Sequence, residues 1–221
     1  MSEVTITVRG ENESRVAPER AVAHVSATVD GPDRGAVVER IAALATPVRE
    51  DLASRHQKGT IVEWASHRVS VWSERPWSSE GVQLDLVHHA SVELTATFTD
   101  FVVLSDWLNA LADVDGIQIG AVDWLLSPET RSRVERDVAT AAVAVAVERA
   151  TAYAGALGLS SVTPLEIADL GLLTGGQEAA GSPRMYAKSA MAMDAAGSSA
   201  VDFQPDDIVV SAAVEARFRA G

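Results

Sequence analysis

The chain has 221 residues, 47% of them hydrophobic, and a chain of this length can bury a core without covalent cross-links. It contains no cysteine, which excludes disulfides, thiolate metal sites and cysteine nucleophiles. Its 18 lysine and arginine residues are outnumbered by 31 aspartate and glutamate residues, a formal net charge of −13. Because this field repels the phosphate backbone, we expect no nucleic-acid partner.

The N-terminal residues, Met1 to Ile6, include neither a basic segment nor an apolar run of signal-peptide length. The longest apolar stretches are far shorter than the roughly 20 residues that a membrane span needs. These features predict a cytoplasmic protein without a membrane span.

Alternation of apolar and polar residues predicts the first two strands, over residues 4–8 and 21–29. A helix follows, because Val37, Ile41, Leu44, Val48 and Leu52 recur at helical spacing. Pro47 lies inside this stripe and is expected to kink or divide the helix.

A short strand is expected over residues 69–72, and the strongest alternation in the chain follows over residues 82–98. There the even-numbered positions are apolar except at His88, which predicts an antiparallel strand with one face in the core and the other in water. A strand of about 17 residues would extend roughly 56 Å. We therefore expect it to bulge or bend near His88 and His89, or to project beyond the sheet.

Asp100 is expected to cap a second helix that ends before Gly116, and residues 117–126 form the next strand. Ser127 and Pro128 predict the start of a long alanine-rich helix that ends at Gly158. Its buried face is expected to carry these residues: Val134, Val138, Ala141, Val145, Ala152 and Ala156.

Strands are expected over residues 162–170 and 208–218. Between them, residues 172–205 lack periodicity and are rich in glycine, alanine and serine, which indicates a long, flexible excursion. The order of elements predicts a single α+β domain over residues 1–221. In it, an antiparallel or mixed sheet carries two or three helices on one face.

The tryptophans offer the first candidate interaction surface, since Trp64, Trp72 and Trp77 lie close together in sequence. Trp64 and Trp72 have the same parity and are expected on one strand face. They are interpreted as core or subunit-interface packing, with an aromatic binding platform as the alternative.

His88 joins this candidate surface from the apolar face of the next strand. It is interpreted as a hydrogen-bonded core or interface histidine, the alternative being a ligand or acid–base role. Adjacent strand residues point to opposite faces, so His88 and His89 are not expected to bind one metal ion. The chain also lacks the zinc-protease, nucleophile-elbow, phosphate-loop and dinucleotide-binding motifs. We therefore expect no catalytic, cofactor or metal site.

Five local motifs, in this order, resemble a known family: Ile6-Thr7-Val8-Arg9-Gly10-Glu11, Gly59-Thr60-Ile61, Gly116-Ile117-Gln118-Ile119-Gly120, Ala154-Gly155-Ala156-Leu157-Gly158 and Phe203-Gln204-Pro205-Asp206. They are similar to the SIMPL-domain family, named after a mammalian signalling protein that associates with a Pelle-like kinase, and the likeness covers nearly the full chain. The resemblance implies links to stress tolerance and to large assemblies, but no catalytic motif. Many bacterial relatives carry an export signal, which this N-terminus does not show.

Two functions follow as hypotheses. The first is a non-enzymatic, homo-oligomeric interaction or scaffold protein, for which a further protein partner of unknown identity is also considered. It is indicated by the missing catalytic set and the over-long strand. The alternative is a small-molecule-binding protein or enzyme with a pocket under the excursion at residues 172–205.

Overall fold

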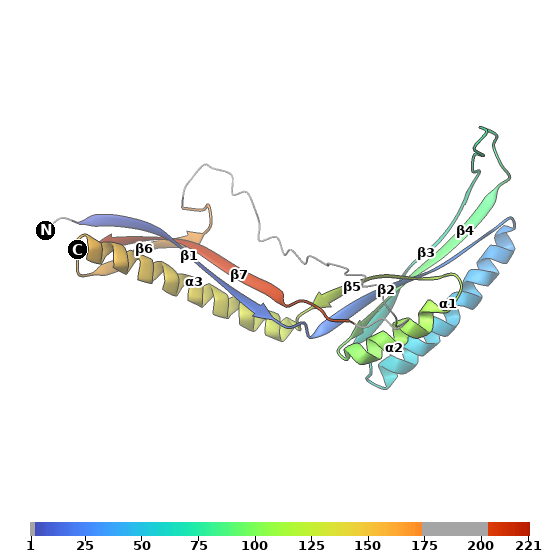
Figure 1. The fold of residues 1–221 in the computed structure, drawn as a ribbon, viewed down its shortest axis with the longest axis horizontal. Helices are drawn as coiled ribbons and strands as arrows, with labels where there is room; N and C mark the ends of the chain where they lie inside the picture. Colours follow the sequence, from blue (N-terminus) through green and yellow to red (C-terminus); the bar gives the residue numbers. More distant parts are fainter. Residues whose placement is uncertain (1–2, 174–202) are drawn as a thin grey trace. The chain divides into compact units, whose positions relative to one another are not determined.

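A computed structural model describes residues 3–173 and 203–221 of the chain. Three helices and two antiparallel sheets are present in this part of the chain, which confirms the α+β class (Figure 1). The described residues divide into two compact units, one of residues 3–17, 126–173 and 206–221, and the other of residues 18–125 and 203–205. The strands that the sequence assigns to one sheet are therefore shared between two sheets.

The first unit is a three-stranded antiparallel sheet covered by one helix. Its strands are β1 (Val4–Val16), β7 (Ile208–Ala220) and β6 (Val162–Asp169), in that spatial order. The helix α3 (Pro128–Ala156) runs along this sheet (Figure 1). β1 and β7 pair over their whole length, from Val4 opposite Ala220 to Val16 opposite Ile208.

Helix α3 begins as the sequence predicts, because the Ser127 side chain accepts a hydrogen bond from the Thr130 amide and Pro128 occupies the first turn. Its buried face differs from the prediction in its second half, where Ala152 and Ala156 are exposed. The buried residues follow a strict spacing of four: Val134, Val138, Ala142, Ala146, Ala150 and Ala154.

The second unit is a four-stranded antiparallel sheet with two helices on one face. Its spatial order is β3 (Glu63–Glu74), β4 (Val87–Phe98), β2 (Arg20–Gly31) and β5 (Ile117–Leu125). The helices α1 (Arg34–Gln57) and α2 (Phe101–Ala112) cover the face that carries the buried residues of β2 and β4 (Figure 1). This core is large and includes Phe98, Leu94, Leu104 and Leu108.

Helix α1 is continuous through Pro47, so the predicted division of this helix is wrong. Its core stripe is Val37, Ile41, Ala45, Val48 and Leu52, while Pro47 lies on an exposed face. The missing amide of a proline is tolerated there because packing of the opposite face holds the helix together.

Helix α2 begins as expected at Asp100, whose side chain accepts hydrogen bonds from the amides of Val102 and Val103 at 2.9 and 3.3 Å. It ends at Ala112, before Gly116, as predicted. Gly116 has a φ of +85°, and β5 starts directly after it.

The long strand predicted over residues 82–98 begins only at Val87, so the prediction is wrong for its first five residues. The predicted bulge at His88 and His89 is also wrong, because both residues pair in regular register with β2, opposite Gly31 and Asp30. The irregularity lies instead in β3, between Ser66 and Arg68. Residues 75–86 extend beyond the paired strands as a separate turn (Figure 1), which is the predicted projection beyond the sheet.

Candidate functional site

The candidate tryptophans do not share a face. Trp64 is paired with Ala96 on the side that the helices cover, and it packs against the core. Trp72 is paired with His89 on the opposite side and is 43% exposed. The extra residue at the register shift, His67, reverses the alternation between them, since a one-residue slip moves every following side chain to the other face. The expected common face of Trp64 and Trp72 is therefore wrong.

The two adjacent histidines point to opposite faces, as strand geometry requires. His88 lies on the helix-covered side, where its Nδ1 and the Ser73 hydroxyl are hydrogen-bonded at 2.6 Å. His89 lies on the other side, and its ring stacks on Trp72 with a centroid distance of 5.1 Å and an interplanar angle of 15°. Its Nε2 lies 3.4 Å from Glu74 Oε1, within ion-pair range but without hydrogen-bond geometry.

A row of polar side chains crosses the open face of the four-stranded sheet. His67 Nε2 and the Thr95 hydroxyl are hydrogen-bonded at 2.8 Å, and His24 Nε2 lies 2.9 Å from Asp123 Oδ2. Thr95 and His24 are directly opposite each other on β4 and β2, so the two pairs are neighbours. Across residues 3–173 and 203–221, no group of three or more metal-binding side chains is assembled. The row is a solvated hydrogen-bonded surface.

Residues 75–86 form an ordered small hairpin beyond β3 and β4. The Ser78 amide donates to the Val82 carbonyl and the Leu84 amide to the Pro76 carbonyl, both at 2.8 Å. The Ser78 hydroxyl accepts from the Val82 amide at 3.1 Å. Gly81, with a φ of +76°, closes the turn. We call residues 72–86 the hairpin tip.

The hairpin tip exposes large apolar side chains. Trp77 is 68% exposed and Val82 is 59% exposed, and Leu84, Leu86 and Trp72 are exposed as well. Val82, Leu84 and Leu86 continue the even-numbered apolar pattern of β4, whose residues from Ala90 onward are buried. The sequence predicted a buried face at these three positions, and the structure exposes it.

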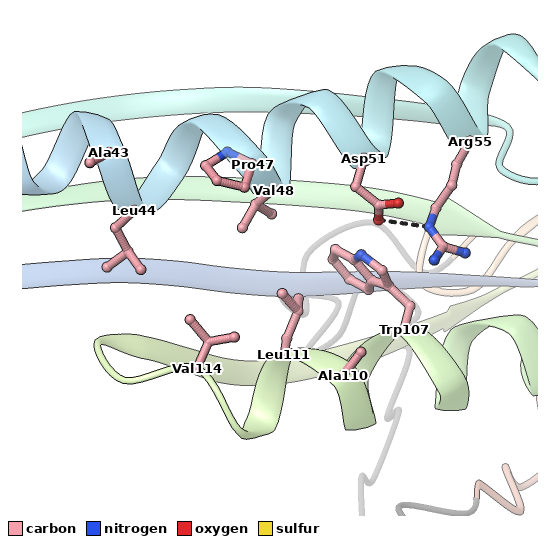
Figure 2. Close-up of a pocket in the computed structure, with 10 residues that line it drawn as sticks. All are labelled: Ala43, Leu44, Pro47, Val48, Asp51, Arg55, Trp107, Ala110, Leu111 and Val114. Carbon is pink, nitrogen blue, oxygen red and sulfur yellow. Dashed lines mark hydrogen bonds and ion pairs between the residues drawn. The ribbon is translucent and has the colours of Figure 1, made fainter.

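A groove lies between α1 and α2 in the same unit (Figure 2). Its volume is about 340 Å³, and Figure 2 shows Leu44 and Val48 of α1 pointing toward Trp107 and Leu111 of α2. At one end, Arg55 Nε lies 2.7 Å from Asp51 Oδ2. The helical spacing of apolar residues predicts a core position for Leu44, but Leu44 is only partly buried and lines the groove.

A second hollow of about 460 Å³ lies nearby, with Thr28, Asp30, Arg40 and Asp115 among its lining residues. The pocket expected under residues 172–205 falls largely outside the described residues, because 174–202 are not among them. Of that segment, Phe203 packs on Trp124 with a centroid distance of 5.6 Å.

Within the described ranges, no helix has the length and apolarity to cross a membrane. No curated protein matches the chain significantly. The sequence model of the SIMPL family, described as “Protein of unknown function (DUF541)”, matches residues 6–218, which include the three helices and β2 to β6 in full and all but the outer two residues of β1 and β7. The motif order in the sequence indicated the same assignment, and the chain therefore belongs to the SIMPL family.

Proposed function

We propose that this protein is a non-enzymatic interaction or scaffold protein that assembles with itself through the hairpin tip. The observation that supports the proposal is the exposure of Val82, Leu84 and Leu86, which continue the buried apolar face of β4 into solvent. Contiguous exposed apolar side chains of this kind are typical of protein–protein contacts.

The composition of the hairpin tip suits a contact surface. Trp72 and Trp77 supply large side chains of the type that dominates binding energy at interfaces. Full burial of a side chain such as Val82, Leu84 or Leu86 contributes about 1.5–3 kcal/mol. The backbone hydrogen bonds of Ser78, Val82 and Leu84 order the turn before binding, so association loses less conformational entropy.

The mass of the protein in solution tests the proposal. We expect the wild-type chain to self-associate in sedimentation velocity and light scattering, and the double variant Trp77→Ser, Leu84→Ser to be monomeric. The matched control is Val102→Ser on α2. It removes an apolar side chain that is 70% exposed, against 68% for Trp77. A wild-type chain that stays a monomer up to about 100 µM would refute the proposal, because association with a dissociation constant below this concentration would be detected.

The cytoplasmic location, the further protein partner and the link to stress tolerance stay predictions from the sequence and the family resemblance. Fractionation of cells that produce the natural protein tests the first of these. Comparison of the growth of a deletion strain under oxidative and heat stress tests the last.

A further inference from the structure

We infer that β3 of one copy pairs antiparallel with β3 of a second copy along its free edge, over residues 68–74. This inference rests on the proposed function and assigns the backbone contact that continues from the hairpin tip, because β3 leads directly into residues 75–86. The two four-stranded sheets then join as one continuous sheet. Both copies use the same strand, so the contact is isologous and closes at a dimer.

Strand β3 has the least protected edge of the two described sheets. Edge strands expose unpaired amides and carbonyls, and proteins block such edges with proline, charges or bulges. β6 contains Pro164, and β5 has a register shift between Ile119 and Val122. β1 carries four charged residues over positions 9–15. β3 carries neither charge nor proline from Val69 to Ser73, and its register is regular there. This segment is therefore open to a further strand.

Two large apolar side chains of this segment are exposed, one on each face. Val69 is 64% exposed, although it pairs with the buried Val92 on the helix-covered side of the sheet. Trp72 is 43% exposed on the open side. Both lie beside the free edge, so a strand paired there would cover part of each.

The length of the regular segment fixes the register of the pairing. The segment begins after the register shift between Ser66 and Arg68, and it ends with the strand at Glu74. Two identical antiparallel segments overlap completely only when the two-fold axis passes through their midpoint, Val71. Val71 then lies opposite Val71 of the second copy, with Val69 as a diagonal neighbour. Four valines therefore meet on the helix-covered side.

The charges at the two ends of the segment are complementary in this register. Arg68 lies opposite Glu74 of the second copy, and Glu74 lies opposite Arg68 of the second copy. Both side chains are exposed, and both lie on the open side of the sheet because they alternate in step with Trp72. Opposite charges across a strand pair stabilise it, whereas like charges destabilise it. An axis at Ser70 or at Trp72 would separate both pairs. Glu93, across from Arg68 on β4 of the same copy, lies on the side away from the free edge.

Charge reversal in the full-length chain tests the register. Arg68→Glu or Glu74→Arg alone places like charges at both ends of the contact, and we expect each to weaken self-association about tenfold. The double variant Arg68→Glu, Glu74→Arg restores both pairs and should associate like wild type. Positions 68 and 74 lie roughly 20 Å apart along one strand, so this rescue can come only from a second copy.

A mixture of the two single variants gives an independent result. One variant carries two carboxylates at these positions and the other carries two guanidinium groups, so we expect a 1:1 mixture to form a heterodimer. The matched controls, Arg133→Glu on α3 and Glu39→Arg on α1, make the same changes in net charge at exposed positions outside β3. They should behave as wild type. Circular dichroism confirms that each variant is folded.

Single cysteine variants locate the axis, because the chain has no native cysteine. Val71→Cys places two Cα atoms roughly 5 Å apart across the axis, within the range for a disulfide. Val69→Cys is the control, since it replaces a more exposed side chain but places the two Cα atoms roughly 14 Å apart. On mild oxidation, we expect Val71→Cys to form disulfide-linked dimers and Val69→Cys to remain unlinked.

The outcomes separate this inference from the proposed function. If the charge variants associate like wild type while Trp77→Ser, Leu84→Ser is monomeric, the β3 edges are not paired and the hairpin tip remains the contact. Failure of the double variant to regain association, or cross-linking of Val69→Cys as fast as Val71→Cys, overturns the register. If the wild-type chain does not associate, both proposals fail.

Discussion

The two units differ in the size of the side chains that pack their helices against their sheets. In the four-stranded unit, the core between sheet and helices contains Phe98, Leu94, Leu104 and Trp107. In the three-stranded unit, α3 contributes alanines at positions 142, 146, 150 and 154 to the buried cluster with β1 and β7. The six largest fully buried side chains of the described residues all belong to the four-stranded unit: Phe98, Leu52, Leu94, Leu104, Leu108 and Val37.

The difference shows that side-chain size sets how closely helix and sheet approach. Gly10 of β1 faces α3, and a Cβ at this position would overlap the Ala142 carbonyl oxygen and lie 2.7 Å from the Ala146 amide nitrogen. Beside it, Arg149 Nη1 donates to the Arg9 carbonyl at 2.8 Å. In this unit the close backbone approach lets alanines of α3 pack beside Ile6, Val8 and Phe218 of the sheet, whereas the other unit buries large side chains from both sheet and helices.

Truncation of a large side chain is expected to have the largest effect. Phe98→Ala would leave a cavity beside Trp107, whose ring centroid lies 5.3 Å from that of Phe98. We expect the free energy of unfolding to fall by about 3–5 kcal/mol. Tryptophan fluorescence during urea unfolding measures this, because all five tryptophans lie in the four-stranded unit.

The control for this variant is Val102→Ala, at a position on α2 that is 70% exposed, where the change should stay within about 0.5 kcal/mol. If Phe98→Ala costs no more than this control, the large side chains do not dominate the stability of this unit.

Enlargement of a small residue should break the close approach in the other unit. We expect Gly10→Ala to lower the free energy of unfolding by about 1–3 kcal/mol or more, because β1 and α3 must separate. Far-UV circular dichroism during urea unfolding is the measurement, since α3 is the longest of the three described helices that contribute to the signal.

The matched control is Gly155→Ala, since a Cβ there meets no atom within 4 Å. Alanine favours the helix, so we expect this variant to gain up to about 1 kcal/mol. Equal effects of the two substitutions would contradict the close approach at Gly10.

Loss of a helix cap should lower the free energy of unfolding less than Phe98→Ala or Gly10→Ala. Asp100→Ala removes the acceptor for two amides at the start of α2, and we expect a loss of about 1 kcal/mol. Asp100→Asn keeps an acceptor oxygen and should lose less. Ser127→Ala provides the comparison in the other unit, where α3 has 29 residues against 12 in α2. If Asp100→Asn is as unstable as Asp100→Ala, charge rather than capping accounts for the effect.

Much of the local structure was predictable from the sequence because local rules specify it. Asp100 and Ser127 were identified as caps from residue type and position, and both side chains accept the expected amides. The period-2 patterns located the strands at both ends and in the middle of the chain, because apolar residues on one face indicate a half-buried sheet. The motif order also identified the family.

The candidate site was less predictable, because its exposure depends on pairing between distant residues. Val82, Leu84 and Leu86 carry the same pattern as Ala90 and Val92, yet only the latter two are covered by helices. No local signal in the sequence marks where that cover ends. The groove between α1 and α2 was also missed, because a periodic stripe gives the direction of a side chain and not its depth.

The sequence by itself determined the order of helices and strands, the caps of α2 and α3, the absence of thiol chemistry and the family, since each depends on residue type or short-range spacing. Tertiary structure alone decided three further features. The strands divide between two sheets, His67 places Trp64 and Trp72 on opposite faces, and the hairpin tip remains uncovered. The physical reason is common to all three: strand register and helix cover arise from contacts between residues far apart in the chain, and a one-residue shift in register reverses every side chain beyond it.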